Sequence, residues 1–158
     1  MGMDVVSSQL LQNRVPRYDD GTMDRILRQE QSSYMQWDNY PDQYFATTTA
    51  AAIGTGLANT DNIISSQGGA TGSYAAGICA DYSVTDGGVT YDDWYLPSED
   101  ELNQLYINRA EIGGFASNYF WSSTESSTPS ARVQHLDGGN KSSLSKAGTW
   151  YLRAVRTF

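Results

Sequence analysis

Few residues of this chain have types suited to acid–base chemistry. The carboxylate run Glu99-Asp100-Glu101 could supply a general acid and a general base, and His135, the single histidine, could move a proton. However, no serine or cysteine nucleophile stands at a recognisable spacing from His135. Ser98 followed by Glu101 is a helix-capping pattern, and the first turn of a helix favours negative charge. We therefore predict that the carboxylates start a helix, that His135 is a surface contact, and that the chain is not an enzyme.

Phosphate and metal sites are also poorly represented. Gly54-Thr55-Gly56 is glycine-rich, but no Gly-Lys-Ser/Thr follows it and no dinucleotide pattern lies between a strand and a helix. Cys79 is the single cysteine, so the sequence offers neither an internal disulfide nor a cysteine-based zinc cluster. Calcium needs several oxygen ligands, and no such cluster is evident. We predict no cofactor and no metal, with Cys79 in a helix core.

Composition and charge narrow the partners. A length of 158 residues suits one domain with a single core. The net charge of −8 and the scattered Lys and Arg argue against nucleic acid. The sequence has no long apolar run and no stretch resembling a signal peptide, and Val6 stands where a myristoylation signal needs Ser or Thr. We expect no membrane insertion. If the protein acts outside a cell, it would have to be released or carried there by other means, such as a virus particle.

The first 45 residues differ from the rest in their pattern of apolar and aromatic residues. Met23, Ile26 and Leu27 form a weak helical stripe, and Tyr34 to Phe45 is an aromatic segment around Pro41. This region could pack on the domain edge, or it could serve attachment or oligomerisation. We predict an N-terminal extension over 1–45 and a domain over 46–158.

Two short helices are expected in the first half of that domain. Asn59 or Thr60 would cap a helix that carries Ile63 and Ile64. Ser73 would start a second helix with buried residues at helical spacing, namely Tyr74, Ala75, Ile78, Cys79 and Tyr82.

A third helix should run from Ser98 to Gly113-Gly114, with Leu102 and Leu105 on its buried face. Downstream we predict strands over 115–124, 132–136 and 150–158, separated by loops over 126–130 and 137–149.

Strand alternation allows only part of the aromatic run to be exposed. Trp121 is expected in the core and Tyr119 at the rim, where an aromatic side chain suits a binding face. Val155 and Phe158 should pack inward. The guanidinium groups of Arg153 and Arg156 need acidic or carbonyl partners if they are half-buried.

A family resemblance appears in a series of ordered motifs. They are Asp93-Trp94-Tyr95-Leu96-Pro97-Ser98, Ile112-Gly113-Gly114-Phe115, Tyr119-Phe120-Trp121-Ser122-Ser123-Thr124-Glu125 and Arg153-Ala154-Val155-Arg156. The series resembles the C-type lectin branch shared by formylglycine-generating enzymes and the C-terminal domain of Legionella collagen-like proteins, over roughly residues 45–158. The resemblance implies an α+β fold with two main helices and small twisted antiparallel sheets.

The resemblance does not extend to the chemistry of that branch. Formylglycine generation uses a pair of cysteines to bind copper, and this chain has one cysteine. The Glu-Pro-Asn, Gln-Pro-Asp and Trp-Asn-Asp strings that hold calcium in many sugar-binding lectins are absent, and Trp37-Asp38-Asn39 has a different order.

Within the branch, the chain is most similar to the variable proteins of diversity-generating retroelements. In that family adenine-directed mutation rewrites the C-terminal region, and Asn codons of the template yield many residue types, but not Lys, Gln, Glu, Met or Trp. Between Ser126 and Thr149 the residues barred by this rule are Gln134, Lys141 and Lys146. The resemblance makes these three fixed scaffold positions.

The resemblance also implies a ligand-facing, diversified set within a variable region of about 117–158. Its members are Tyr119, Ser126, Ser127, Thr128, Ser130, Val133, His135, Asp137, Gly138, Ser142, Ser143, Ser145, Ala147, Gly148, Thr149 and Tyr151. The implied function is a receptor-type protein, displayed on a virus particle or cell surface, that binds a protein or cell-surface ligand. Two alternatives stay open: a non-diversified adhesin or structural domain of the same fold, and ordinary solvated loops without a partner.

Overall fold

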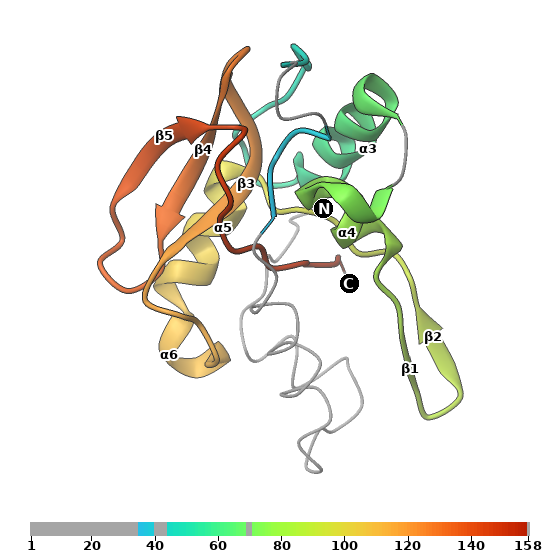
Figure 1. Ribbon diagram of the computed structural model, residues 1–158. Helices are drawn as coiled ribbons and strands as arrows, with labels where there is room; N and C mark the ends of the chain where they lie inside the picture. Colours follow the sequence, from blue (N-terminus) through green and yellow to red (C-terminus); the bar gives the residue numbers. More distant parts are fainter. Residues whose placement is uncertain (1–34, 40–43, 69–70, 158) are drawn as a thin grey trace.

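The computed structural model describes residues 35–39, 44–68 and 71–157 (Figure 1). Helices and two small antiparallel sheets alternate along this part of the chain, which confirms the α+β class. The elements are α3 (Gly56–Gln67), η1 (Thr71–Ser73), α4 (Ala75–Asp81), β1 (Val84–Asp86), β2 (Val89–Tyr91), α5 (Glu99–Ile107), α6 (Arg109–Ile112), β3 (Tyr119–Ser127), β4 (Ser130–His135) and β5 (Lys141–Ser145).

The predicted start of α5 is confirmed in atomic detail. The Ser98 hydroxyl accepts a hydrogen bond from the Glu101 backbone N–H, and the Glu101 carboxylate accepts one from the Ser98 N–H at 2.7 Å. Leu102 and Leu105 are buried, as their spacing predicts. The helix does not run unbroken to the glycines. It is interrupted at Asn108, whose side-chain amide donates to the Gln104 carbonyl at 2.9 Å and so competes with the helical ladder.

The predicted caps of the first two helices are wrong in position. Asn59 and Thr60 are buried inside α3, which begins at Gly56. Instead of capping, Asn59 bonds both backbone groups of Ala50, and Thr60 bonds the carbonyl of Gly56. Ser73 lies in η1, and α4 begins two residues later, with Cys79 buried as predicted.

The main sheet has the strand order β3-β4-β5, with antiparallel neighbours. The first two strands were predicted within a few residues, but β5 lies inside the segment predicted as a loop. The strand predicted over 150–158 is wrong. Over its described residues that segment makes only isolated bridges, in which single residues pair without a ladder: Met35 with Trp150, Phe120 with Tyr151 and Tyr95 with Val155.

Consecutive residues of β3 point into two separate cores. Trp121 is fully buried and packs with Trp37, Ile63 and Val133, so the prediction that it lies in the core is confirmed. Phe120 faces the other side, where it packs with Leu102 and Leu105 of α5 and with other buried residues. This alternation makes β3 the wall between two hydrophobic cores, and Figure 1 shows α5 alongside the sheet.

The aromatic segment before residue 45 contributes to the domain itself. Trp37 is fully buried and its indole N–H donates to the Ser122 carbonyl at 2.8 Å. Met35 forms a bridge with Trp150. The predicted domain boundary at 45/46 therefore falls inside the packed structure, whereas the helical stripe at Met23 to Leu27 lies outside the described residues.

The C-terminal arginines have the partners that their burial demands. Arg153 is 2% exposed and donates to the carbonyls of Gly113 and Gly114. Arg156 pairs with Asp93 through two hydrogen bonds of 2.6 and 2.9 Å. Val155 is buried as predicted, and Phe158 lies outside the described residues.

Candidate ligand-binding surface

Glu101, in the acidic run at the start of α5, accepts backbone hydrogen bonds that hold the local structure. The Glu101 carboxylate accepts hydrogen bonds from Ser98 N–H and, at 2.9 Å, from Gly54 N–H. Burial raises the pKa of Glu101, and these backbone bonds oppose the increase. A Cβ on Gly56 would collide with the same carboxylate. The glycine-rich segment therefore encloses an internal carboxylate at the start of α3, the position where a phosphate loop would hold its anion.

The side chain of His135 interacts with the turn that follows it. Its Nδ1 accepts from the backbone N–H of Gly138 at 3.2 Å, and the ring contacts Tyr119 edge to face. Among the described residues, no three His, Cys, Asp or Glu side chains gather as a metal site would require. This environment fits a surface contact better than a proton shuttle.

The predicted ligand-facing positions divide by exposure. Ser126, Ser127, Thr128, Asp137, Gly138, Ser143, Ser145 and Thr149 are exposed, whereas Tyr119, Ser130, His135, Ser142, Ala147, Gly148 and Tyr151 are half-buried.

Val133 is a correction to this set. Its side chain is 2% exposed and packs in the core that contains Trp121, which is its partner in the register of β3 and β4. Because the residue lies at an inward position of a strand, it cannot contact a ligand.

Strand pairing also separates positions that the sequence placed in one loop. His135 and Ser142 share the face of the sheet that carries Trp121 and Val133. Ser143 lies on the opposite face, where its hydroxyl accepts from Arg132 at 3.0 Å. A ligand on one face would therefore meet only part of the predicted set.

Three aromatic rings form a partly exposed cluster at the end of the first face. We call Tyr119, His135 and Trp150 the aromatic patch. The ring centroids of Tyr119 and His135 are 5.1 Å apart, those of Tyr119 and Trp150 are 5.8 Å apart, and both pairs meet edge to face. The predicted ligand-facing set leaves out Trp150, because the template rule treats tryptophan as fixed scaffold. Its position directly after the exposed Thr149 was the available signal.

Two other predicted positions have structural constraints of their own. Tyr151 stacks on Phe120 with ring centroids 5.3 Å apart. A side chain at Gly148 would approach the Trp150 indole nitrogen to 2.9 Å and the Ser145 carbonyl oxygen to 3.1 Å. Gly138, by contrast, has room for a side chain, since the nearest atoms would lie at 3.7 Å or more.

The three positions expected to be fixed are held by specific contacts. The Gln134 side chain is buried and donates to Asn103 Oδ1 at 2.9 Å and to the Gly139 carbonyl at 3.1 Å. Lys141 is more exposed and lies 3.7 Å from a Glu99 carboxylate oxygen. Lys146 is the most deeply enclosed of the three.

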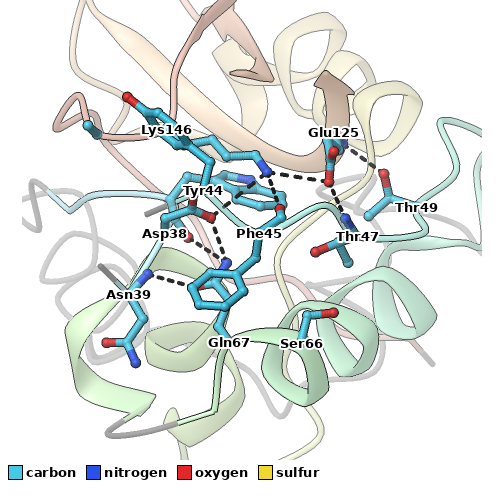
Figure 2. Close-up of polar contacts among 12 residues, drawn as sticks. Asp38, Asn39, Tyr44, Phe45, Thr47, Thr49, Ser66, Gln67, Glu125 and Lys146 are labelled. Carbon is cyan, nitrogen blue, oxygen red and sulfur yellow. Dashed lines mark hydrogen bonds and ion pairs between the residues drawn. The ribbon is translucent and has the colours of Figure 1, made fainter. Parts of the chain in front are cut away.

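Figure 2 shows Lys146 with Asp38 and Glu125. We call Lys146, Asp38, Glu125 and Trp37 the lysine cluster. The ammonium donates to the Phe45 carbonyl at 2.7 Å and lies 3.3 Å from Glu125 Oε2 and 3.9 Å from Asp38 Oδ1. It also lies 4.3 Å from the centre of the Trp37 ring. Burial raises the pKa of Asp38 to about 6, against the opposing effect of Lys146.

A shallow hollow of about 400 Å³ lies between α6 and the turn after β4. Its wall carries opposite charges, with Arg109 on α6 and Asp137 on the turn, and Phe115 and Leu136 supply apolar surface. Ser117 donates to the Asp137 carboxylate at 3.0 Å. Asp137 is thus a member of the predicted ligand-facing set that also lines this hollow of mixed polarity.

Comparison with known proteins assigns no relative. No known protein family matches the chain, and no curated protein matches it in sequence. Among the described helices, none is both long and apolar enough to cross a bilayer.

Proposed function

We propose that the chain is a ligand-binding protein of the C-type lectin type whose C-terminal surface residues are diversified by a retroelement. It would be displayed on a virus particle or cell surface and recognise a protein or cell-surface ligand without catalysis. The ordered sequence motifs support the lectin assignment. Leu96, Trp121 and Val155 from three of them are buried, which is compatible with a role of these motifs in the fold.

The observation that carries the proposal is the contrast between fixed and replaceable positions within one polar stretch. Of the three residues that the template rule bars from variation, Gln134 and Lys146 are buried and hydrogen-bonded, and Lys141 is exposed and pairs with Glu99. Eight of the sixteen positions assigned to variation are exposed: Ser126, Ser127, Thr128, Asp137, Gly138, Ser143, Ser145 and Thr149. Exposed substitutions typically change stability by less than about 0.5 kcal/mol, so such positions can vary while the fold persists.

Recognition would depend on surface complementarity. The aromatic patch offers ring edges that need little ordering on binding, and the surrounding hydroxyl groups offer adaptable hydrogen bonds. A few central contacts would carry most of the affinity, while changes at neighbouring positions alter specificity.

The test is a binding screen of the displayed chain against candidate host envelopes. Substitutions at His135, Asp137 and Ser143 are measured in parallel for binding and for thermal unfolding. Loss of binding with unchanged unfolding supports the proposal. Unfolding of the variants would make these positions structural and contradict it.

A genomic observation separates the proposal from a non-diversified adhesin of the same fold. Diversification requires a near-identical template repeat that differs mainly at adenines, with a reverse transcriptase gene nearby. A binding chain without either would be the fixed adhesin.

A further inference from the structure

The lysine cluster brings a primary amine and two carboxyl groups together inside the protein. The side chains of Lys146 and Asp38 are both 0% exposed, and that of Glu125 is 11% exposed. The amine nitrogen lies 3.9 Å from Asp38 Oδ1, so the carboxyl group that it would attack is its immediate neighbour.

The backbone holds this arrangement independently of the side chains. The backbone N–H groups of Trp37 and Asp38 both approach the Lys146 carbonyl oxygen, at 3.0 and 3.5 Å. The Gln67 side chain donates to Asp38 Oδ1 at 2.9 Å and orients the carboxyl group (Figure 2). Both reacting groups therefore have little freedom to move apart.

Burial shifts both groups toward their uncharged forms. Burial raises the pKa of Asp38 to about 6 and lowers the pKa of Lys146, although the carboxylates of Asp38 and Glu125 oppose the latter. A neutral amine is a nucleophile, and a protonated carboxyl group is an electrophile.

We propose that Lys146 and Asp38 become joined by an amide bond that the folded chain forms by itself. Nζ of Lys146 attacks Cγ of Asp38, and the new Nζ–Cγ bond replaces one Cγ–O bond. Glu125 accepts a proton from the attacking amine and returns it to the departing oxygen, which leaves as water. The reaction is a condensation, so it needs no oxidant, reductant or other reactant.

Such a bond would suit this chain for a physical reason. It closes a loop from residue 38 to residue 146, which includes most of the domain. Cross-links that close long loops stabilise a fold mainly by restricting the unfolded chain, and Cys79 alone cannot supply a disulfide within the chain. The amide would fix the frame behind the exposed positions of β4 and β5, whether or not those positions vary.

The test is the intact mass of the full, denatured chain, followed by peptide mapping. We expect a mass lower than the sequence mass by one water molecule, and a branched peptide that joins Asp38 to Lys146. Mapping is essential, because Asp20-Gly21, Asp86-Gly87 and Asp137-Gly138 could also lose water by forming a succinimide. An unchanged mass, or separate peptides for Asp38 and Lys146, overturns the proposal.

Variants assign the roles within the cluster. Asp38→Ala and Lys146→Arg should each retain the full mass, and Glu125→Gln should slow bond formation by about 100-fold or more, as expected for loss of a general acid–base. Lys141→Arg, at an exposed lysine of β5, is the matched control and should lose water as the unaltered chain does. Bond formation at an unchanged rate in Glu125→Gln would contradict the role of Glu125. The wild-type peptide map decides the proposal even if a variant fails to fold.

Discussion

The buried and the exposed positions of the polar stretch 126–149 hold their side chains in opposite ways. Lys146 and Gln134 point inward and find specific partners, whereas Asp137 and Ser143 are exposed and Thr149 lies at the surface beside Trp150. Composition does not distinguish these positions. The difference teaches that a polar side chain is costly to replace when it is buried with partners for which water cannot substitute.

The largest predicted difference between the two regions comes from Lys146→Ala. This change leaves Asp38 and Glu125 without their buried counter-charge, and removal of one member of a buried ion pair costs about 3–5 kcal/mol. Chemical denaturation measures the loss. Lys141→Ala removes an exposed lysine whose ion pair contributes about 0–1 kcal/mol. Equal losses of unfolding free energy in the two variants would show that the burial of Lys146 does not make it more important for stability than Lys141.

A smaller effect is expected for Gln134→Ala. The substitution leaves the Gly139 carbonyl and the Asn103 side chain without their partner, at a cost of about 1–3 kcal/mol. Asn140→Ala, at an exposed amide beside the same turn, should change the unfolding free energy by less than about 0.5 kcal/mol. A destabilised Asn140→Ala with a stable Gln134→Ala would reverse the assignment of fixed and replaceable positions.

The two glycines of the predicted set sharpen the comparison within the exposed region. Gly148→Ser forces a side chain against the Trp150 ring and the Ser145 carbonyl, and we expect a loss of about 1–3 kcal/mol. Gly138→Ser meets no atom closer than 3.7 Å and should be tolerated. Thermal unfolding of the two variants measures the difference. If Gly148→Ser is as stable as Gly138→Ser, position 148 can also accept a side chain.

The smallest effects are expected for single substitutions at Ser126, Thr128, Ser143 and Thr149. Their side chains are exposed, so each change should alter the unfolding free energy by less than about 0.5 kcal/mol. Denaturant midpoints at constant slope provide the measurement. A loss above 1.5 kcal/mol at most of these positions, roughly the scale of a buried hydrogen bond, would place them in the frame.

The sequence predicted those parts of the fold that have local signals. The capping box of Ser98 and Glu101, the buried face of α5 and the core position of Trp121 follow from short patterns of charge and apolar spacing. Cys79 was predictable in the same way, from helical spacing among apolar residues.

Parts that depend on distant pairing were not predictable. Strand β5 consists of Lys, Ser and Leu, and its pairing with β4 comes from backbone hydrogen bonds that polar residues also make. The segment after Trp150 is apolar like a strand, but its backbone pairs with other segments only through single bridges. Val133 was misplaced for the same reason, because its inward direction depends on its register with Trp121.

The lysine cluster also depends on long-range contacts. Asp38 and Lys146 are separated by more than one hundred residues, and the pairing of their backbones places them together. The template rule selected Lys146 as fixed without indicating why. In the structure Lys146 is a buried amine with three oxygen partners beside the Trp37 ring, so we expect replacements there to be costly.

The most direct test of the account compares two displayed libraries of this chain. One randomises the exposed positions Ser126, Asp137, Ser143 and Thr149, and the other randomises Val133, Gln134 and Lys146. Each is sorted for folded protein and then for binding to host envelopes. We predict that most members of the first library remain folded and that its binders differ in specificity, while most members of the second unfold. Equal loss of folding in both libraries, or folded members of the first with identical binding, would contradict the account.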